Sequence, residues 1–120
     1  MFEIRRFRGD AAGRNSGSAA GGFAWAVATA DEPFPDIYTQ TQAALAKIDR
    51  ILAGLGTDKT RLVNATVYVD KMAMKGEMDR AWREWIGDDP AHWPQRACVE
   101  AHLFDFHMVE IVVIATAPQS

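Results

Sequence analysis

The segment from Met108 to Thr116 constrains the fold most, because it is typical of a strand that is apolar on both faces. Successive side chains of a strand point to opposite faces of a sheet. Here the two sets are Val109, Ile111 and Val113 on one face, and Val112 and Ile114 on the other. Such a strand needs a cover on each face of its sheet, so the remaining chain has to provide the covering elements or recruit them.

Two amphipathic helices are predicted, and both can cover the same face of a sheet. The first begins after Asp36, whose carboxylate suits an N-cap, and ends before Gly56, which suits a left-handed stop. The second follows Asp70 and ends at residues 87–90. Their apolar stripes are Ile37, Thr41, Ala44, Ile48, Ile51, Leu52 and Leu55, then Met74, Met78, Ala81 or Trp82, and Trp85. No element is left for the second face, so another copy of the chain is the economical cover and a homo-oligomer is predicted.

The other strands are predicted at residues 2–7, 61–69 and 95–102, and as two short strands within 18–28 that turn at Gly21-Gly22. In the 61–69 segment we expect Val63, Ala65, Val67 and Val69 on one face, and Leu62, Asn64, Thr66 and Tyr68 on the other. The order is then β-β-β-α-β-α-β-β. This order predicts one α+β domain over residues 1–120, with a mixed six-stranded sheet.

Composition excludes several classes of protein. The 13 basic and 16 acidic residues give a net charge of -3, which argues against a nucleic-acid partner held through phosphates. The one cysteine, Cys98, excludes an internal disulfide and favours a cytoplasmic setting. Residues 19–30 follow four arginines and imitate an export signal, but they contain Gly21 and Gly22 and no leucine. No apolar run approaches the roughly 20 residues that span a bilayer, so no membrane partner is expected.

Two places carry charge where a buried strand is expected. Arg96, Cys98, Glu100 and His102 share one face of the 95–102 segment. This row is either a solvated edge or a functional site, and Cys98 is either an activated thiolate or a small buried side chain. Glu110 interrupts the apolar last strand, and it either pairs with a neighbouring arginine or has a chemical role.

Metal and cofactor sites are not indicated. His92, His102 and His107 lie close together in the sequence, but no two of them have the i, i+4 spacing of a helical metal pair. The glycine-rich residues 13–17 do not continue into a lysine, so they are not a phosphate-binding loop. We therefore expect no metal site.

Several motifs together resemble the Rid (reactive intermediate deaminase, YjgF) family. They are the Thr-Gln-Thr-Gln start of residues 39–48, Leu52 to Gly56, Ala-Thr-Val-Tyr-Val at 65–69, Met-Asp-x-Ala-Trp at 78–82, and Arg-Ala-Cys-Val-Glu at 96–100 with the later Val-Glu-Ile at 109–111. The resemblance covers residues 36–116, and its most specific part is the strand with Arg96 and Cys98 together with the later Val-Glu-Ile at 109–111.

The resemblance implies a subunit of the chorismate mutase-like fold that assembles into a homotrimer with three clefts between neighbours. It implies hydrolysis of 2-imino or 2-enamino acids to 2-keto acids and ammonia, without a cofactor. Arg96 corresponds to the residue that grips the carboxylate of the small substrate, and Glu110 to the residue that orients or activates water. Backbone groups near Cys98 are expected to line the site. A ribonuclease activity is also ascribed to some relatives, but the net charge of -3 offers no phosphate track.

The sequence departs from the family pattern around the expected cleft. Residues 13–17 replace a G-P-Y-S-Q-like stretch, so the pocket tyrosine is missing, and residues 27–29 replace an S-G-Q-like segment. Asp79 stands where an asparagine is common. These changes suggest a specialised paralogue, in which Arg14 offers a second cation to a dicarboxylic substrate. The alternative is a non-catalytic protein that binds small carboxylates or regulates through the same cleft.

Overall fold

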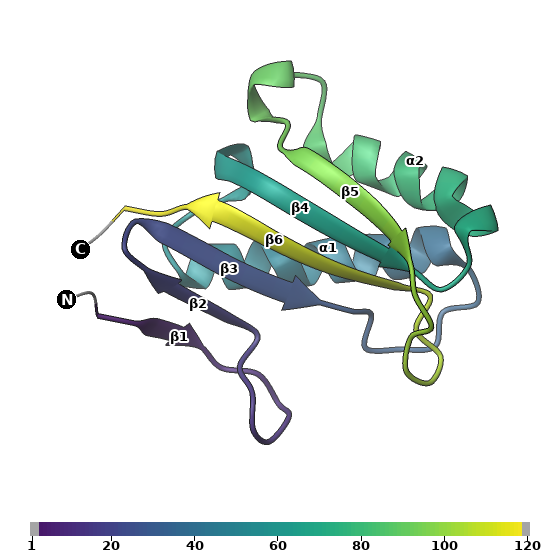
Figure 1. The fold of residues 1–120 in the computed structure, drawn as a ribbon, viewed down its shortest axis with the longest axis horizontal. Coiled ribbons are helices and arrows are strands. Elements are labelled where there is room, and N and C mark those ends of the chain that lie inside the picture. The colour runs from purple at the N-terminus through teal and green to yellow at the C-terminus, as the bar shows by residue number, and fades with distance from the viewer. Residues whose placement is uncertain (1–2, 119–120) are drawn as a thin grey trace.

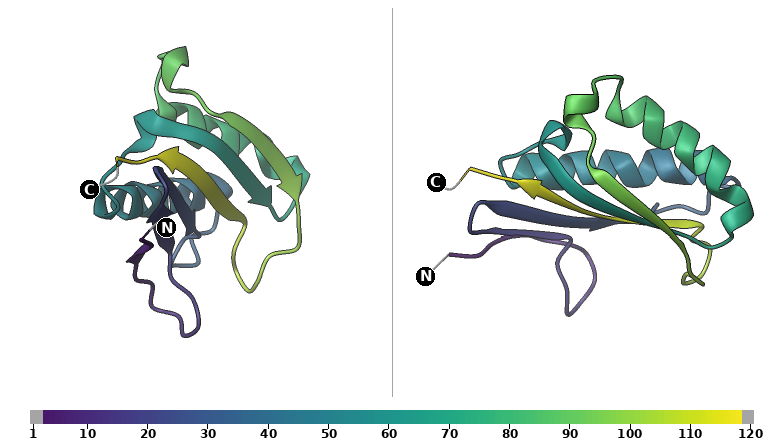
Figure 2. Two further views of the ribbon diagram at one scale, coloured as in Figure 1. Left: turned by 60° about the vertical axis from the view of Figure 1, so that its left-hand side comes forward. Right: turned by 45° about the horizontal axis from the view of Figure 1, so that its top comes forward.

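The computed structural model describes residues 3–118, in which a mixed six-stranded sheet carries two α-helices on one face (Figures 1 and 2). The strands are β1 (Arg5–Phe7), β2 (Gly17–Ala20), β3 (Phe23–Ala28), β4 (Leu62–Val69), β5 (Gln95–Glu100) and β6 (Val109–Thr116). Their order in the sheet is β1-β2-β3-β6-β4-β5, and only the β4–β5 pair is parallel. The helices are α1 (Ile37–Gly54) and α2 (Lys75–Ile86), and the short 3-10 helices are Lys59–Arg61, Met72–Met74 and Pro90–His92.

The predicted ends of α1 are confirmed. The Asp36 carboxylate accepts a hydrogen bond from the backbone N–H of Thr39 at 2.7 Å, as an N-cap does. After the helix, Gly56 has a φ of 81°, in the left-handed region that glycine adopts without strain. Gly21 and Gly22 have φ values of 61° and 87°, so they form the expected tight turn between β2 and β3.

Small residues let α1 lie close to the sheet. The side chains of β2 and β3 that face α1 are alanines, and they are buried: Ala19, Ala24, Ala26 and Ala28. At Gly17 even a methyl group does not fit, because a Cβ there would lie 2.5 Å from Ile51 Cγ2 and 2.8 Å from the carbonyl oxygen of Trp25. The segment that imitates an export signal therefore forms inner strands of the sheet. Among the described residues, no helix combines the length and apolar character needed to cross a membrane.

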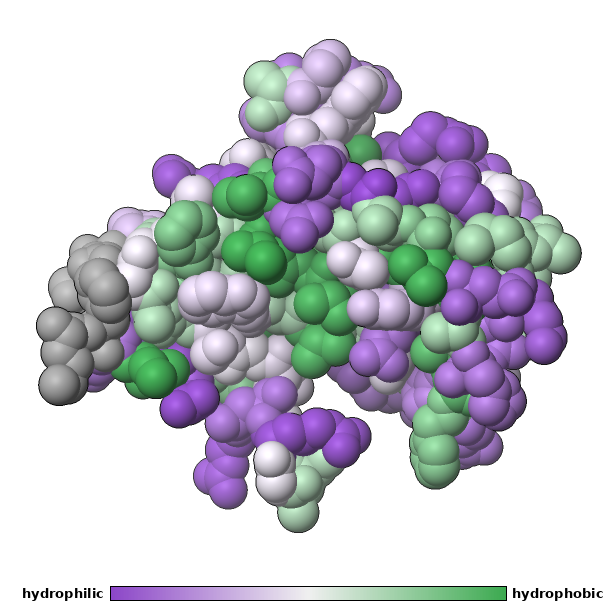
Figure 3. All heavy atoms as spheres, viewed as in Figure 1, coloured by the Kyte–Doolittle hydropathy of each residue, from purple (hydrophilic) through white to green (hydrophobic). Residues whose placement is uncertain are grey.

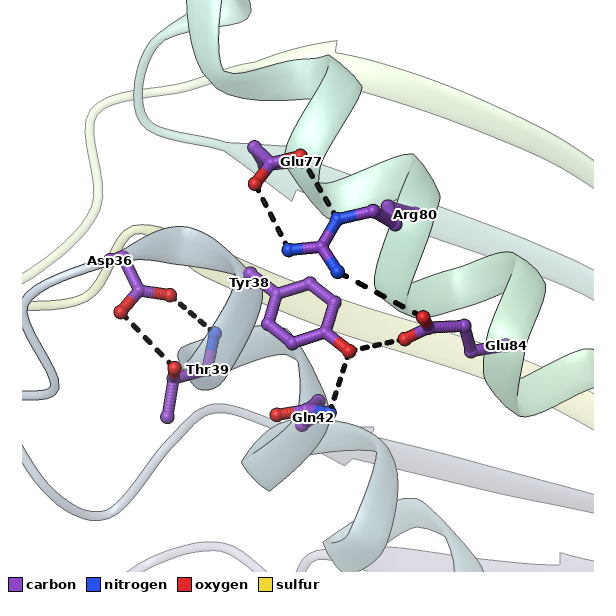
Figure 4. A network of polar contacts seen from close by, with 7 residues as sticks. All are labelled: Asp36, Tyr38, Thr39, Gln42, Glu77, Arg80 and Glu84. Atoms are coloured by element: carbon purple, nitrogen blue, oxygen red, sulfur yellow. Dashed lines mark hydrogen bonds and ion pairs between the residues drawn. The ribbon is translucent and has the colours of Figure 1, made fainter.

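A polar network joins the two helices and fixes the orientation of α2 (Figure 4). The Arg80 guanidinium lies 3.6 Å from the centre of the Tyr38 ring, and its Nη2 and Nε each donate to Glu77 at 3.1 Å. The Tyr38 hydroxyl donates to Glu84 and accepts from Gln42 Nε2 at 3.0 Å. These contacts lie on the exposed side of α2, while Met78, Trp82 and Ile86 on its inner side are buried in the core.

Three strand predictions need correction. The strand expected at residues 95–102 ends at Glu100, so His102 lies beyond β5 and does not share a face of it with Arg96. The strand expected at residues 2–7 is shorter, since β1 begins at Arg5, and Phe2 lies outside the described residues. In β4 the expected faces are wrong at the start of the strand, where Leu62 is buried and Val63 is 40% exposed. A register shift between Leu62 and Asn64 against β6 is the reason, because one extra residue reverses the alternation. From Ala65 onward the predicted faces are confirmed.

Within residues 3–118, no helix or strand covers the second face of the sheet. Hydrophobic side chains gather over the middle of this open face (Figure 3). Trp25 alternates with the buried alanines of β3, and Val99 alternates with Arg96 and Cys98 of β5; they are 39% and 41% exposed. The other face of β6 is buried against the helices at Val109, Ile111 and Val113. The prediction that two helices cover one face and leave the other open is confirmed.

Candidate functional site

The guanidinium of Arg96 is held between β5 and α2. Its Nη2 donates a hydrogen bond to Asp79 Oδ1 at 2.6 Å, and its Nη1 lies 3.8 Å from Met78 Sδ. The guanidinium carbon is 5.3 Å from the centre of the Trp82 ring, so the cation also contacts an aromatic side chain. The Arg96 side chain is only 18% exposed. A solvated edge therefore does not describe Arg96, which is oriented by three neighbours.

Asp79 divides its two carboxylate oxygens between two cations. Oδ1 pairs with Arg96, and Oδ2 accepts from Lys75 Nζ at 2.6 Å, one helical turn earlier. Burial by itself raises the pKa of Asp79, but the hydrogen bonds from Lys75 and Arg96 outweigh burial and hold the pKa below its usual value. Asp79 is therefore ionised at neutral pH. It orients Arg96 and also competes for its charge with any carboxylate that binds there.

Cys98 lies two residues along the same face, opposite Val67 of β4. Burial raises the pKa of the Cys98 thiol, although Arg96 and Lys75 act in the other direction. A thiol with a raised pKa is protonated at neutral pH and is a poor nucleophile. The structure therefore favours the interpretation of Cys98 as a small, partly buried side chain and not an activated thiolate.

The other two members of the predicted row point to different partners. Glu100 Oε1 accepts from the backbone N–H of Met72 at 2.7 Å. The side chain of His102 is 95% exposed, and its Nδ1 lies 3.5 Å from Asp70. The row thus separates into an enclosed pair, Arg96 and Cys98, and an exposed pair that stabilises local structure.

Glu110 lies on the opposite face of the sheet from Arg96. In the β4–β6 register it stands beside Tyr68, while its neighbours Val109 and Ile111 are buried against the helices. Among residues 3–118, no lysine or arginine nitrogen comes within 4.0 Å of the Glu110 carboxylate. The alternative in which Glu110 pairs with a neighbouring arginine for structure therefore does not apply within one chain.

Glu110 lines a cavity of about 640 Å³. The cavity lies where the β1–β2 connection, which projects from the sheet in Figures 1 and 2, meets the end of β3 and the side of α1. Arg14 lines it from that connection, and Lys47 and Arg50 line it from α1. The predicted site residues thus form two groups, with Arg96, Asp79 and Cys98 in one and Glu110 and Arg14 in the other.

The histidines do not gather around a common point. His102 is near Asp70, His92 lies 3.7 Å from Asp89, and His107 Nε2 lies 3.1 Å from the carbonyl oxygen of Ala30. Within the described part of the chain, no group of three or more His, Cys, Asp or Glu side chains is arranged to hold a metal ion.

Sequence reasoning missed several residues of both groups. Lys75 stands four residues before Asp79, and this i, i+4 spacing on a predicted helix was a usable signal. No local sequence pattern indicates that Trp82 contacts Arg96, or that Arg8 and Arg50 lie at the cavity. They depend on how α2 meets β5 and on how the β1–β2 connection meets α1.

Comparison with protein-family models matches residues 17–117 to the family described as Endoribonuclease L-PSP. Among curated proteins, a RutC family protein from Haemophilus ducreyi is 48% identical over 81 residues, which are 67% of this chain and 68% of the relative. The RutC family protein YoaB of Escherichia coli is 32% identical over 81 residues, covering 67% of this chain and 69% of YoaB.

The fold is shared with solved structures over almost the whole chain. A YjgF family member from Neisseria meningitidis superposes with a TM-score of 0.88 at 31% identity, and the match covers 98% of each chain. YyfA of Yersinia pestis, described as a protein of unknown function of the conserved Rid family, has a TM-score of 0.84 at 22% identity and covers 93% of this chain and 94% of its own. The second similarity supports the fold alone.

Proposed function

The chain belongs to the Rid (YjgF) family, and from this premise we propose that it hydrolyses reactive 2-imino or 2-enamino acids to 2-keto acids and ammonia. The observation that carries the proposal is the oriented Arg96 guanidinium, in contact with Asp79 and Trp82 on the strand with the family's most specific motif. Arginine suits this task because its planar fork donates two parallel hydrogen bonds to a carboxylate.

Arg96 is proposed as the anchor for the substrate carboxylate. Its hydrogen bond to Asp79 uses Nη2, which leaves N–H groups on the rest of the fork for a ligand. A carboxylate bound there fixes the imine carbon in space, and such positioning accounts for much of the catalysis of a reaction whose carbon is already electrophilic. Backbone groups of the strand at Cys98 complete this side of the site.

Glu110 is proposed as the group that activates water. It lies in a cavity open to small molecules and has no ion-pair partner among the described residues, so its carboxylate is available to accept a proton. Water adds to the carbon of the protonated imine while Glu110 accepts a proton from the water, which gives the neutral tetrahedral carbinolamine. Glu110 returns this proton to nitrogen, and the C–N bond breaks as the hydroxyl group gives its own proton to Glu110. The products are the 2-keto acid and ammonia, to which Glu110 finally passes the proton. A positioned general base of this kind contributes about 10²–10⁴-fold to a rate.

A complete site is proposed to require two subunits. Arg96 packs against α2 on one face of the sheet, whereas Glu110 belongs to the other face, so one chain does not bring both to one substrate. The open apolar face needs a cover, and a neighbouring copy supplies both the cover and the missing half of the site. We propose a homotrimer, in which each cleft uses Arg96 of one copy and Glu110 of the next.

One observation favours a second candidate function, a non-catalytic protein that binds small carboxylates. The cavity beside Glu110 is lined by residues 14–16 and 27–29, the stretches that depart from the family pattern, so the wall that would serve turnover has changed while the Arg96 guanidinium keeps its orientation. Such a protein binds 2-keto acids through Arg96 without accelerating imine hydrolysis.

The test generates imino acids in situ with an amino acid oxidase and measures release of 2-keto acid above the spontaneous rate. Arg96→Ala is expected to lower kcat/KM about 10- to 100-fold, as loss of a charged hydrogen-bonding group does. Glu110→Gln is expected to lower kcat about 10²-fold or more, because the amide does not accept the proton. Arg61→Ala and Glu32→Gln change exposed residues outside both groups and serve as matched controls.

The outcomes separate the alternatives. If the wild type accelerates no imine over a broad amino-acid panel but binds 2-keto acids in an Arg96-dependent way, the binding protein replaces the enzyme. If Arg96→Ala equals the wild type in rate, the anchor is assigned wrongly. Cleavage of RNA at rates that Arg96→Ala and Glu110→Gln leave unchanged would point to the ribonuclease activity in the family's description.

A further inference from the structure

The cavity that contains Glu110 also collects arginines from two separate parts of the chain. Arg8 and Arg14 belong to the β1–β2 connection, and Arg50 projects from α1. Among residues 3–118, none of these three forms an ion pair within 4.0 Å. Lys47, the fourth cation of the lining, is already paired with Asp31 at 2.7 Å. Three guanidinium groups therefore have no acidic partner in the part of the chain that the structure describes.

This concentration of positive charge is unusual for this chain. Its net charge is -3, yet the free cations of the cavity outnumber its free acids, which are Asp10 and Glu110. Guanidinium groups brought together repel one another unless an anion lies between them, and arginine is suited to bind planar carboxylates. The lining is therefore complementary to a ligand with negative charge at this end.

The base of the β1–β2 connection is anchored, so the position of its arginines is defined by the fold. The backbone N–H of Ser16 donates to the carbonyl oxygen of Phe7 at 3.0 Å. The carbonyl oxygen of Ser16 accepts from the backbone N–H of Val27, also at 3.0 Å. A Cβ on Gly9 would lie 2.6 Å from Ser16 Oγ, which shows how closely the two sides of the connection approach. Arg8 and Arg14 therefore sit on a closed loop that is joined to the edge of β3.

The size of the cavity gives room for a second functional group. A volume of about 640 Å³ falls within the usual range for small-molecule sites, roughly 300–1,000 Å³. An imino acid with a short aliphatic side chain needs only a small part of this space. Glu110 and the arginines line the same cavity, so it has room for the far end of a longer substrate as well.

We propose that the cavity is a subsite for a second carboxylate, and that the preferred substrates are 2-imino dicarboxylic acids, the imines of acidic amino acids. Arg14, together with Arg8 and Arg50, binds the distal carboxylate, and Glu110 faces the imine carbon. The inference rests on the proposed function, in which Arg96 of a neighbouring copy holds the first carboxylate. It adds to that function the substrate class and three residues that select it.

The test compares imines of equal chain length, generated by oxidases from glutamate and from norvaline. The wild type is expected to favour the glutamate-derived imine in kcat/KM. The double variant Arg14→Gln/Arg50→Gln is expected to lose about 10- to 100-fold on this substrate, in proportion to the loss of charged hydrogen bonds, and to keep its rate on the norvaline-derived imine. Arg61→Gln, an exposed arginine outside the cavity, is the matched control and is expected to change neither rate.

A calorimetric measurement keeps the subsite separate from catalysis. The wild type is expected to bind 2-oxoglutarate more tightly than 2-oxopentanoate, and the double variant to lose the difference. If no imine is hydrolysed but this binding preference is found, the proposed function fails and the subsite stands. If the wild type binds both keto acids equally, binds neither, or loses affinity for both equally in the double variant, the subsite is overturned.

Discussion

Asp79 on α2 holds Arg96 on β5 through a hydrogen bond of 2.6 Å, and both side chains are largely enclosed, at 16% and 18% exposure. A charged pair in such a place orients the arginine but also occupies part of it. Any carboxylate that binds Arg96 therefore competes with Asp79. This relationship makes Asp79 a positioning residue for the proposed anchor, and it can be tested apart from Arg96 itself.

Replacing Asp79 by asparagine removes the negative charge and keeps an acceptor for Arg96. We expect Asp79→Asn to bind 2-keto acids more tightly than the wild type, because the competing charge is gone while the guanidinium keeps its orientation. Asp79→Ala is expected to bind them more weakly, since it loses the orientation too. Calorimetric titration with 2-oxobutyrate measures both effects. Equal affinities for the wild type, Asp79→Asn and Asp79→Ala would show that the contact does not affect the anchor.

The Asp79 carboxylate also makes the free energy of unfolding depend on pH. Because the folded pKa of Asp79 is lowered, its ion pairs stabilise the fold fully above the unfolded-state pKa of about 4 and are lost as the pH falls through the lower folded value. The free energy of unfolding should therefore differ most between wild type and Asp79→Asn near pH 7, and the difference should shrink below about pH 4. Urea unfolding at several pH values measures this, with Asp88→Asn as an exposed control. A difference that is constant from pH 7 to pH 3 would contradict the assignment.

Mixing two impaired variants tests whether a site is shared between subunits. Arg96→Ala lacks only the anchor and Glu110→Gln lacks only the base. If each cleft takes Arg96 from one copy and Glu110 from the next, about a quarter of the clefts in a randomly mixed ring carry both groups. Joint refolding at equal amounts should then restore about a quarter of the wild-type rate. No recovery, in mixtures shown by mass spectrometry to have exchanged subunits, would place both groups on one chain's site.

Two glycines should respond to alanine in opposite ways. Gly17→Ala forces a methyl group against Ile51 and the backbone of β3, and overpacking of this kind costs about 1–3 kcal/mol. Gly76 lies in α2, and a Cβ there meets no described atom within 4 Å, so Gly76→Ala is expected to stabilise the protein by up to about 1 kcal/mol. Thermal and urea unfolding measure both changes. If Gly17→Ala unfolds like the wild type, the close packing of β2 on α1 is wrong.

Cys98 should behave as a poor nucleophile. Because burial raises its pKa, iodoacetamide should label the folded protein at pH 7 more slowly than it labels the urea-unfolded chain, and the rate should rise only at alkaline pH. Mass spectrometry at timed intervals follows the reaction. Fast labelling of the folded protein at neutral pH would revive the alternative of an activated thiolate.

Much of the fold could be predicted because its signals are local. The cap at Asp36, the left-handed Gly56 and the turn at Gly21-Gly22 are each decided by a few neighbouring residues, and each is found where expected. The start of β4 could not be predicted, because the shift at Leu62 and Asn64 arises from pairing with β6 and leaves no mark in the alternation.

For the candidate site, the face that each residue occupies could be predicted strand by strand, but the arrangement of these residues as a whole could not. Alternation assigned Arg96 and Cys98 to one face of their strand, and the structure agrees. Whether Arg96 and Glu110 lie on the same face of the sheet depends on the strand order β6-β4-β5 and on the register of these strands. Neither can be read from the sequence of a single strand. The arginines of the cavity likewise converge only after the β1–β2 connection and α1 are brought together.

Because Arg96 and Glu110 lie on opposite faces of one sheet, a defect in one copy affects more than one cleft of the proposed assembly. In the proposed ring each copy gives its anchor to one cleft and its base to another. A single copy that misfolds, or that lacks both Arg96 and Glu110, therefore inactivates two clefts. Partial loss of function in such a protein is expected to exceed the fraction of defective copies, so defects in a minority of chains have a dominant effect.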